Sequence, residues 1–260
     1  MQLVTIMNYP DQDNYNRMLK LFIHQLYIHH SKPSDKCELL ILTQKGVSRE
    51  VVNYINNNIP YNDKFIVRIE KVWPHLNPFI DHHNIKFKLY NLCRIDKPFI
   101  FLDADIFVLS NLNFLWERRN IKPFIGINHQ QVPNHSTLCS HKFLNSGVQI
   151  VGDPDWYNYE RIEESYNRNN KQLHVPGIDQ AAIYDYCQNI KYDYTHPEIG
   201  YGWNACAGYT RIFKDGSKYY GICSGLKEAD APPEYQVYIN HYWNEFKPWN
   251  INCPIYVDKI

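Results

Sequence analysis

The segment Pro98-Phe-Ile-Phe-Leu-Asp-Ala-Asp105 decides how the rest of the sequence is interpreted. Its apolar run, Pro98 to Leu102, is typical of a strand covered on both faces of a sheet, and two carboxylates follow it directly. In an open α/β sheet, ligands bind beyond the carboxyl ends of the strands, which is where Asp103 and Asp105 fall. In extended chain, residues two apart point to one face and lie about 6.6 Å from each other. Because such carboxylates repel unless a proton or a cation lies between them, the segment predicts a divalent-cation site.

Spacing alone does not single this pair out, because the chain contains two other Asp-x-Asp sequences. Asp11-Gln-Asp13 and Asp153-Pro-Asp155 both stand beside or contain a proline, which is a turn signal, and we assign both to surface loops. The pair after Leu102 differs because a buried strand delivers it. The competing interpretation of that pair is an ordinary strand-end turn with two solvated carboxylates.

On both sides of this strand, the sequence alternates between strand-like and helix-like segments. We expect strands over residues 1–8, 39–42, 65–72 and 98–102, helices over 15–27, 51–55 and 86–93, and shorter strands over 124–128, 148–151 and 237–240. This alternation predicts right-handed crossovers and a mostly parallel sheet. The expected fold is therefore α/β, as a single domain over residues 1–260. It would have a Rossmann-like nucleotide-binding half over about 1–105 and a substrate-facing half over about 106–260.

Composition narrows the class of protein. The 260 residues carry 27 Lys and Arg against 27 Asp and Glu, so the formal net charge is zero. A protein that binds nucleic acid or anionic membranes usually carries an excess of basic residues, and this chain has no such excess. Hydrophobic residues at 44% and aromatic residues at 15% are ample for a core and too many for disorder. The abundance of Asn, Ile, Lys and Tyr is typical of an A/T-rich genome, a viral one included. We therefore expect a globular enzyme.

The cysteines and the hydropathy predict a compartment. There are seven cysteines and none forms a Cys-x-x-Cys pair, which indicates reduced, mostly buried thiols and not a zinc ribbon or a disulfide framework. The first residues lack the basic and apolar regions of a signal peptide, and no apolar stretch approaches the length of a membrane span. The expectation is a cytoplasmic protein without a transmembrane segment.

Three further motifs carry polar groups that suit a ligand site. Asn145-Ser-Gly147 places a small-residue turn before a strand, and its amide can both donate and accept. Asp179-Gln180 is typical of a helix N-terminus, where a capping role for Asp179 competes with a catalytic one. The third motif is His241 followed by Lys247-Pro-Trp249. An imidazole added to two carboxylates suits Mn²⁺ better than Ca²⁺ or Mg²⁺. Lys247 offers a fixed positive charge. An ordinary turn, a core histidine and a salt-bridged surface lysine are the plainer alternatives.

Taken together and in order, these motifs resemble a known family. The series is Phe87-Lys-Leu89, Phe99-Ile-Phe-Leu-Asp-Ala-Asp105, Leu144-Asn-Ser-Gly-Val148, Asp179-Gln180 and His241-Tyr-Trp-Asn-Glu-Phe-Lys-Pro-Trp249. It is similar to glycosyltransferase family 8, the glycogenin-like retaining transferases with a GT-A fold, and the similarity runs from the first strand to Trp249. The resemblance implies a GT-A fold with an acceptor-side extension and a hexosyltransferase that uses a nucleotide-diphosphate sugar.

The resemblance also implies a role for each motif. Asp103 and Asp105, as the DxD motif, would hold Mn²⁺, or Mg²⁺, with His241 as the third protein ligand. Asp179 and Lys247 would be catalytic, with Lys247 on the diphosphate and Asp179 beside the donor sugar. The donor-binding residues would be Thr5, Asn8, Tyr9, Lys88, Asp103, Ala104, Asp105, Asn145, Ser146, Gln180, Asn244 and Lys247.

The chain departs from the family pattern at two places. Asn244 stands where such families usually carry Gly, three residues after the metal histidine, and the loop Asn8-Tyr-Pro-Asp-Gln-Asp-Asn14 differs from the usual Thr-Asn-x-x-Tyr. The second departure falls in the loop that the resemblance assigns to the uracil and ribose. We also place Trp203 and Asn204, which lie in a loop flanked by glycine, in the acceptor cleft.

The resulting hypothesis is a metal-dependent transferase that moves a hexose from a UDP-sugar to an acceptor hydroxyl. Its partners would be the nucleotide-sugar donor and a glycan or protein acceptor, with a homodimer as one assembly open to it. A sugar-1-phosphate nucleotidyltransferase is the first alternative, but residues 8–14 lack the Gly, Lys and Arg that such enzymes carry in this loop. A non-catalytic nucleotide-sugar or glycan-binding relative is the second alternative, and a complete Asp-Asp-His set argues against it.

Overall fold

The computed structural model describes residues 1–7, 13–30, 36–60, 64–71, 95–127, 144–158, 160–162, 164–165, 178–206, 212–213, 228–229 and 238–242. The helix expected over 86–93 lies outside these residues. So do five of the expected donor-site residues: Asn8, Tyr9, Lys88, Asn244 and Lys247.

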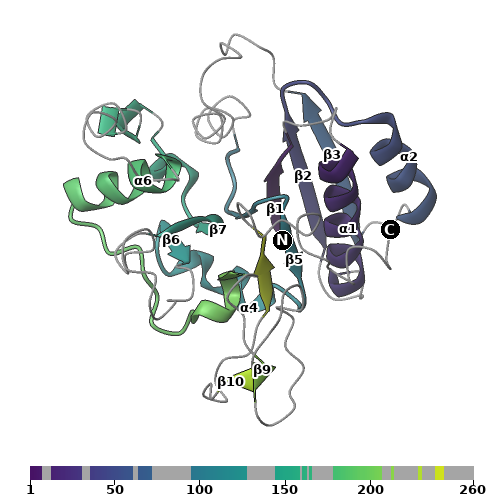
Figure 1. Cartoon of the computed structure of the whole chain (residues 1–260). Helices are drawn as coiled ribbons and strands as arrows, with labels where there is room; N and C mark the ends of the chain where they lie inside the picture. Colours follow the sequence, from purple (N-terminus) through teal and green to yellow (C-terminus); the bar gives the residue numbers. More distant parts are fainter. Residues whose placement is uncertain are drawn as a thin grey trace.

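A six-stranded sheet forms the centre of the molecule, in the order β3-β2-β1-β4-β7-β6 (Figure 1). The four strands of the first half pair in parallel, and β7 and β6 complete the sheet in antiparallel pairings. A mostly parallel α/β sheet is thus confirmed. The strands are β1 Gln2–Ile6, β2 Cys37–Thr43, β3 Phe65–Lys71, β4 Phe99–Leu102, β6 Phe124–Ile127 and β7 Asn145–Val151.

Helices cover both faces of this sheet. Alternate strand residues enter two separate cores, so that Leu3 packs with the apolar side of α1 while the next residue, Val4, packs with that of α6. This explains why β4 is apolar at every position. The helices are α1 Asp13–His30, α2 Arg49–Asn58, α4 Asn113–Glu117 and α6 Ile178–Asn189, with the 3-10 turns η1 Arg118–Asn120, η2 Pro154–Trp156 and η3 Tyr201–Asn204.

A second, smaller sheet lies beyond the end of β4. Its order is β5 (Ile106–Val108), β11 (Ile239–His241) and β8 (Ala205–Cys206), and it joins segments that are far apart in sequence. His241 pairs with Ile106 in the antiparallel register of β11 and β5. The pair β9 (Ile212–Phe213) and β10 (Glu228–Ala229) completes the described strands.

Buried thiols account for the cysteines whose side chains are described. Cys37 and Cys187 are both buried and neither of the two forms a disulfide, as the sequence predicts. Burial raises the pKa of Cys187 to about 12, so its reactive thiolate is scarce at neutral pH. Among the described residues, no helix is at once long enough and apolar enough to cross a membrane.

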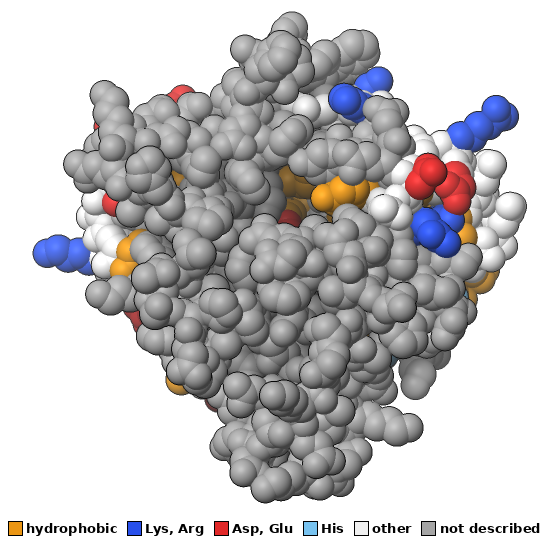
Figure 2. Space-filling view, in the orientation of Figure 1, with side chains coloured by type: hydrophobic (Ala, Val, Ile, Leu, Met, Phe, Trp, Pro, Cys, Tyr) orange, Lys and Arg blue, Asp and Glu red, His pale blue; other side chains and the backbone are white. Residues whose placement is uncertain are grey.

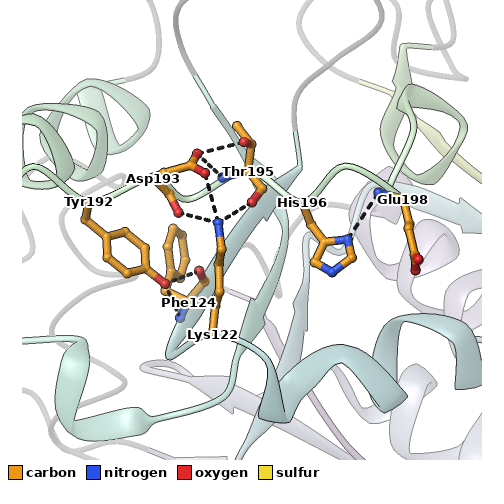
Figure 3. A network of polar contacts seen from close by, with 7 residues as sticks. All are labelled: Lys122, Phe124, Tyr192, Asp193, Thr195, His196 and Glu198. Carbon is orange, nitrogen blue, oxygen red and sulfur yellow. Dashed lines mark hydrogen bonds and ion pairs between the residues drawn. The ribbon is translucent and has the colours of Figure 1, made fainter.

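The segment after α6 protects the outer edge of the sheet at β6 (Figure 3). The Tyr192 hydroxyl donates to the Phe124 carbonyl at 2.7 Å and accepts from the Phe124 N–H at 3.1 Å. The Gly126 N–H donates to the Tyr194 carbonyl at 3.1 Å. The Tyr192 side chain and the Tyr194 carbonyl therefore bond backbone groups of β6 that would otherwise be open to pairing with another strand.

A single lysine anchors this protective segment. Lys122 Nζ donates to the carbonyls of Asp193 and Thr195 at 2.8 and 2.6 Å and to Asp193 Oδ2 at 3.0 Å (Figure 3). Hydrogen bonds from Thr195 and then from Lys122 lower the pKa of Asp193 to about 2. The carboxylate therefore stays ionised at neutral pH and accepts from Lys122.

Tyr192→Phe should lower the free energy of unfolding by about 1–3 kcal/mol, because it leaves a backbone N–H and a carbonyl at Phe124 without their partner. Tyr54→Phe is the matched control, since the Tyr54 hydroxyl has no hydrogen-bond partner among the described residues and its loss should stay within about 0.5 kcal/mol. Urea unfolding of both variants measures the difference. Equal losses would show that the Tyr192 hydroxyl does not stabilise this edge.

Candidate functional site

The two aspartates after β4 are held through their backbone by two neighbouring strands. The Asp103 N–H donates to the Gly147 carbonyl in β7 at 2.8 Å, and the Tyr242 N–H, just after β11, donates to the Asp105 carbonyl at 2.9 Å. Ala104 and Asp105 form a turn and not the extended chain that the sequence predicted. The extended geometry behind the expected separation of about 6.6 Å is therefore wrong, and one ligand atom of each aspartate lies within 4.8 Å of the other.

His241 completes a cluster with these carboxylates. Its Nε2 lies 3.6 Å from Asp103 Oδ2 and 3.4 Å from Asp105 Oδ1, and one ligand atom from each residue lies within 4.8 Å of the others. Two ligands at right angles around an ion, each about 2.1–2.4 Å from it, are about 3.0–3.4 Å apart, so the spacing suits a shared cation. The histidine side chain is 4% exposed and the carboxylates are 19% and 16% exposed, so the cluster opens on the aspartate side. Figure 2 shows a hollow in the face of the molecule with an acidic side chain on its floor.

Gly147 leaves the space that the imidazole occupies. A Cβ at this position would lie 2.2 Å from His241 Cε1, 2.6 Å from His241 Nδ1 and 2.9 Å from Asn145 Oδ1. No side chain fits at those distances. The glycine of the Asn145-Ser-Gly147 motif is thus explained by the close approach of β11 to β7, and the same residue supplies the carbonyl that holds Asp103.

A chain of side-chain amides continues from His241 to α6. His241 Nδ1 lies 3.1 Å from Asn204 Oδ1, and Asn204 Nδ2 donates to Asn145 Oδ1 at 2.9 Å. Asn145 Nδ2 in turn donates to Gln180 Oε1 at 2.9 Å. The structure therefore brings together predicted residues from β7, α6 and β11, and it joins them through Asn204.

The 3-10 turn η3 holds Asn204 by stacking its neighbour. The Trp203 ring is stacked between Phe114 at 5.2 Å and Tyr238 at 4.2 Å, measured between ring centroids. The Arg118 guanidinium lies 3.3 Å from the centroid of the Phe114 ring and closes the outer end of the stack. Trp203 is 5% exposed and belongs to the core, so its assignment to the acceptor cleft is wrong. Asn204 is fully buried and its amide is engaged by Ile127, Asn145 and His241, so that assignment is wrong for it too.

The remaining predicted residues lie at several places around this cluster. Thr5 is fully buried near the end of β1, and its Oγ1 has no hydrogen-bond partner among the described residues. Ser146 is buried in β7, and Gln180 is half-buried in α6. Asp179 is in the first turn of α6, where the sequence predicted a helix N-terminus. The link from Asn204 to His241 was not predicted, because no local pattern joins residues 37 positions apart.

Comparison with solved structures identifies the fold. No protein-family model matches the sequence, and no curated protein matches it in sequence. The structure nevertheless superposes on the galactosyltransferase LgtC, solved with donor and acceptor sugar analogs, with a TM-score of 0.58 and 14% identity over 99% of this chain and 92% of that one. The chain has the GT-A fold.

Two other glycosyltransferases share this GT-A fold over part of their length. GlyE of Streptococcus pneumoniae matches 96% of the chain at 18% identity with a TM-score of 0.60, and the bifunctional WbbM matches 96% at 16% identity with a TM-score of 0.56. The matched region is 56% of the GlyE chain and 47% of the WbbM chain. LgtC, GlyE and WbbM are of the family 8 type, so the resemblance found in the sequence is confirmed at the level of the fold.

Gly147→Ala should disturb the cluster directly. The added methyl group must displace the His241 ring, so we expect the Mn²⁺ affinity to fall about tenfold or more and the free energy of unfolding to fall by about 1–3 kcal/mol. Gly200→Ala is the control, because a Cβ there meets nothing within 4 Å. Calorimetric titration with Mn²⁺ measures both variants. An affinity of the Gly147 variant within twofold of the wild type would contradict the assigned packing.

Proposed function

We propose that this protein is a metal-dependent glycosyltransferase that moves a hexose from a UDP-sugar to an acceptor hydroxyl with retention of configuration. One observation carries the proposal: two carboxylates and an imidazole converge at the carboxyl end of β4, within a GT-A fold. A galactosyltransferase of the same fold has been solved with donor and acceptor sugar analogs. Ligand binding at the carboxyl ends of parallel strands supports the same location.

The donor set of the cluster fits a divalent cation of borderline softness. Two carboxylate oxygens and an imidazole nitrogen favour Mn²⁺ over Ca²⁺, with Mg²⁺ as the harder alternative. Asp103, Asp105 and His241 would hold the ion, which when bound supplies Lewis-acid neutralisation of the donor's diphosphate. The carboxylates also need such a partner, because they lie close together and mostly shielded from water.

The donor would extend from this cluster along the end of the parallel sheet. We assign the uracil and ribose to the end of β1 and its following loop, at Thr5, Asn8 and Tyr9. The Thr5 hydroxyl has no partner among the residues that the structure describes, and this supports the assignment, since a buried hydroxyl without a partner costs free energy that a ligand can recover. The diphosphate would meet Lys247 and Asn244, with Lys88 beside the donor. Ala104, between the two aspartates, leaves room for close approach.

The donor sugar would meet the amide chain at Gln180. Because Gln180 Oε1 accepts from Asn145, its Nε2 donors are turned to other partners, and a sugar hydroxyl or ring oxygen is a suitable one. Ser146 would line the same site. As the bond from the anomeric carbon to the phosphate oxygen breaks, the Lys247 ammonium would stabilise the charge that grows on the leaving diphosphate.

Two routes to retention remain open in this proposal. In one, the Asp179 carboxylate attacks the anomeric carbon as the bond to the diphosphate breaks, and the acceptor oxygen then displaces the carboxylate while its proton passes to a phosphate oxygen of the departed diphosphate. In the other, the acceptor attacks on the face that the diphosphate leaves, and its proton passes to a phosphate oxygen of the leaving group. The second route needs no nucleophile from the protein, and Asp179 then serves as the first-turn residue of α6.

Release of sugar from a panel of UDP-sugars in the presence of Mn²⁺ tests the proposal. One donor should be hydrolysed, and excess chelator should stop the reaction. Asp103→Asn and Asp105→Asn should each reduce turnover to below a tenth, while the thermal stability without metal stays the same or rises, because one of two repelling carboxylates is neutralised. Turnover that persists in chelator would refute the metal dependence. Synthesis of a nucleotide sugar from a nucleoside triphosphate and a sugar-1-phosphate would favour the nucleotidyltransferase alternative.

Asp179→Asn and Gln180→Ala should lower sugar transfer much more than UDP affinity. Both residues lie in the first turn of α6, and within the described part of the chain Gln180 is joined to the cluster through Asn145. Transfer rates and UDP binding by calorimetry, measured on the same preparations, separate the two effects. A parallel loss of UDP affinity and rate would instead indicate that these residues stabilise the start of the helix.

A further inference from the structure

Two backbone groups determine the orientation of the side-chain amides behind His241. The Gly147 N–H donates to Asn145 Oδ1 at 2.8 Å, and a backbone N–H can only donate. Asn145 must therefore present its oxygen to Gly147 and its nitrogen to Gln180, as the contact at 2.9 Å shows.

The orientation of Asn204 follows from the same kind of argument. Its Nδ2 lies 2.9 Å from the Ile127 carbonyl and 2.9 Å from Asn145 Oδ1, and both of these oxygens can only accept. The two hydrogens of the Asn204 amide are thus used by two acceptors. A flipped amide would place its oxygen against two other oxygens, which the buried site does not tolerate. Asn204 Oδ1 must face His241.

We propose that Asn204 is a positioning residue that keeps the proton of His241 on Nδ1 and so leaves the Nε2 lone pair for a cation. Asn204 Oδ1 lies 3.1 Å from His241 Nδ1 and can only accept, so Nδ1 donates. The other nitrogen, Nε2, faces the Asp103 and Asp105 carboxylates at 3.6 and 3.4 Å. This inference rests on the proposed function for the identity of the site, and it adds how the chain prepares the imidazole.

The carboxylates make such a device necessary. Without a cation, two carboxylate oxygens near Nε2 favour a proton on that nitrogen, and a proton there blocks the lone pair that would bind the ion. Asn204 opposes this, because the Nε2–H tautomer would direct the Nδ1 lone pair at the Asn204 oxygen in a fully buried place. A ligand histidine whose other nitrogen donates to a fixed acceptor is the arrangement that raises metal affinity.

The fold gives Asn204 little freedom to move away. Trp203, its neighbour in η3, is stacked between two rings, and β8 begins at the next residue and pairs with β11 beside His241. The register shift between Gly126 and Ile127 lies where the Ile127 carbonyl accepts from Asn204. The turn η3 and the strands β8 and β6 therefore all restrict the position of the Asn204 side chain.

The tautomer can be measured directly in the wild-type protein without metal. Nitrogen-15 NMR of histidine-labelled protein at alkaline pH, where imidazoles are neutral, distinguishes a protonated Nδ1 from a protonated Nε2, and His241→Gln identifies the resonance. We expect the proton of His241 on Nδ1. A proton on Nε2 in the wild type would overturn the proposal, whatever happens to any variant.

Asn204→Leu removes the acceptor while filling a similar volume. The proton should move to Nε2, and the affinity for Mn²⁺ alone should fall about 10- to 100-fold. Gln149→Leu is the matched control: this buried amide in β7 donates to the Ser146 carbonyl and accepts from the Tyr157 hydroxyl, away from His241. Its Mn²⁺ affinity should stay within threefold of the wild type. An unchanged affinity in the Asn204 variant, or an equal loss in both, would overturn the proposal.

Asn204→Ala provides a second test should the leucine variant fail to fold, because it removes the acceptor without adding bulk. The proton should again move to Nε2, and the Mn²⁺ affinity should again fall. A proton that stays on Nδ1 in this variant would count against the assigned role. Neither the tautomer nor Mn²⁺ binding requires a sugar donor. Failure of UDP-sugar turnover would therefore refute the proposed function while these two measurements still decide the role of Asn204.

Discussion

The backbone of the Asp103–Asp105 turn depends on hydrogen bonds from two different sheets. The carbonyl of Gly147, in the central sheet, accepts from Asp103, while the N–H of Tyr242, at the end of the small sheet, donates to Asp105. A shift of one sheet against the other would separate Asp103 from His241, because Asp103 is bonded to the central sheet and His241 belongs to the small one. The antiparallel pairing of β11 with β5 places His241 opposite Ile106, directly after this turn.

The approach of β11 to β7 is close enough to exclude a side chain, and this has two consequences. It requires glycine at position 147, and it shields the imidazole of His241 from water on the side away from the carboxylates. Polar groups in such a place must be paired with each other, since water is not there to replace a missing partner. The chain of Asn145, Asn204 and Gln180 meets this requirement. Each of these amides contacts a group that can only donate or can only accept, and this determines which way the amide faces.

Several elements follow from local pattern and agree with the structure. The apolar periodicity of residues 15–27 predicted a helix where α1 spans Asp13–His30, and the apolar runs around 39–42 and 98–102 predicted β2 and β4. Ser48 caps α2 by accepting from the Val51 N–H at 3.3 Å, so that helix begins before the predicted 51–55. The short strands β5 and β8 were not predicted, because three and two residues show no period and their pairing partners lie far along the chain.

In the candidate site too, some features follow from the sequence and others only from the tertiary structure. Sequence alone determined the α/β class and the grouping of Asp103, Asp105 and His241 as one candidate cluster, because residue type and order carry that information. The roles that it predicts for Asn145, Asp179 and Gln180 stay predictions. Only the tertiary structure decided that the aspartates form a turn, that Trp203 belongs to the core and that Asn204 contacts His241. These features depend on distances between segments tens of residues apart, and such distances are set by sheet register and by the packing of η3, which no local pattern encodes.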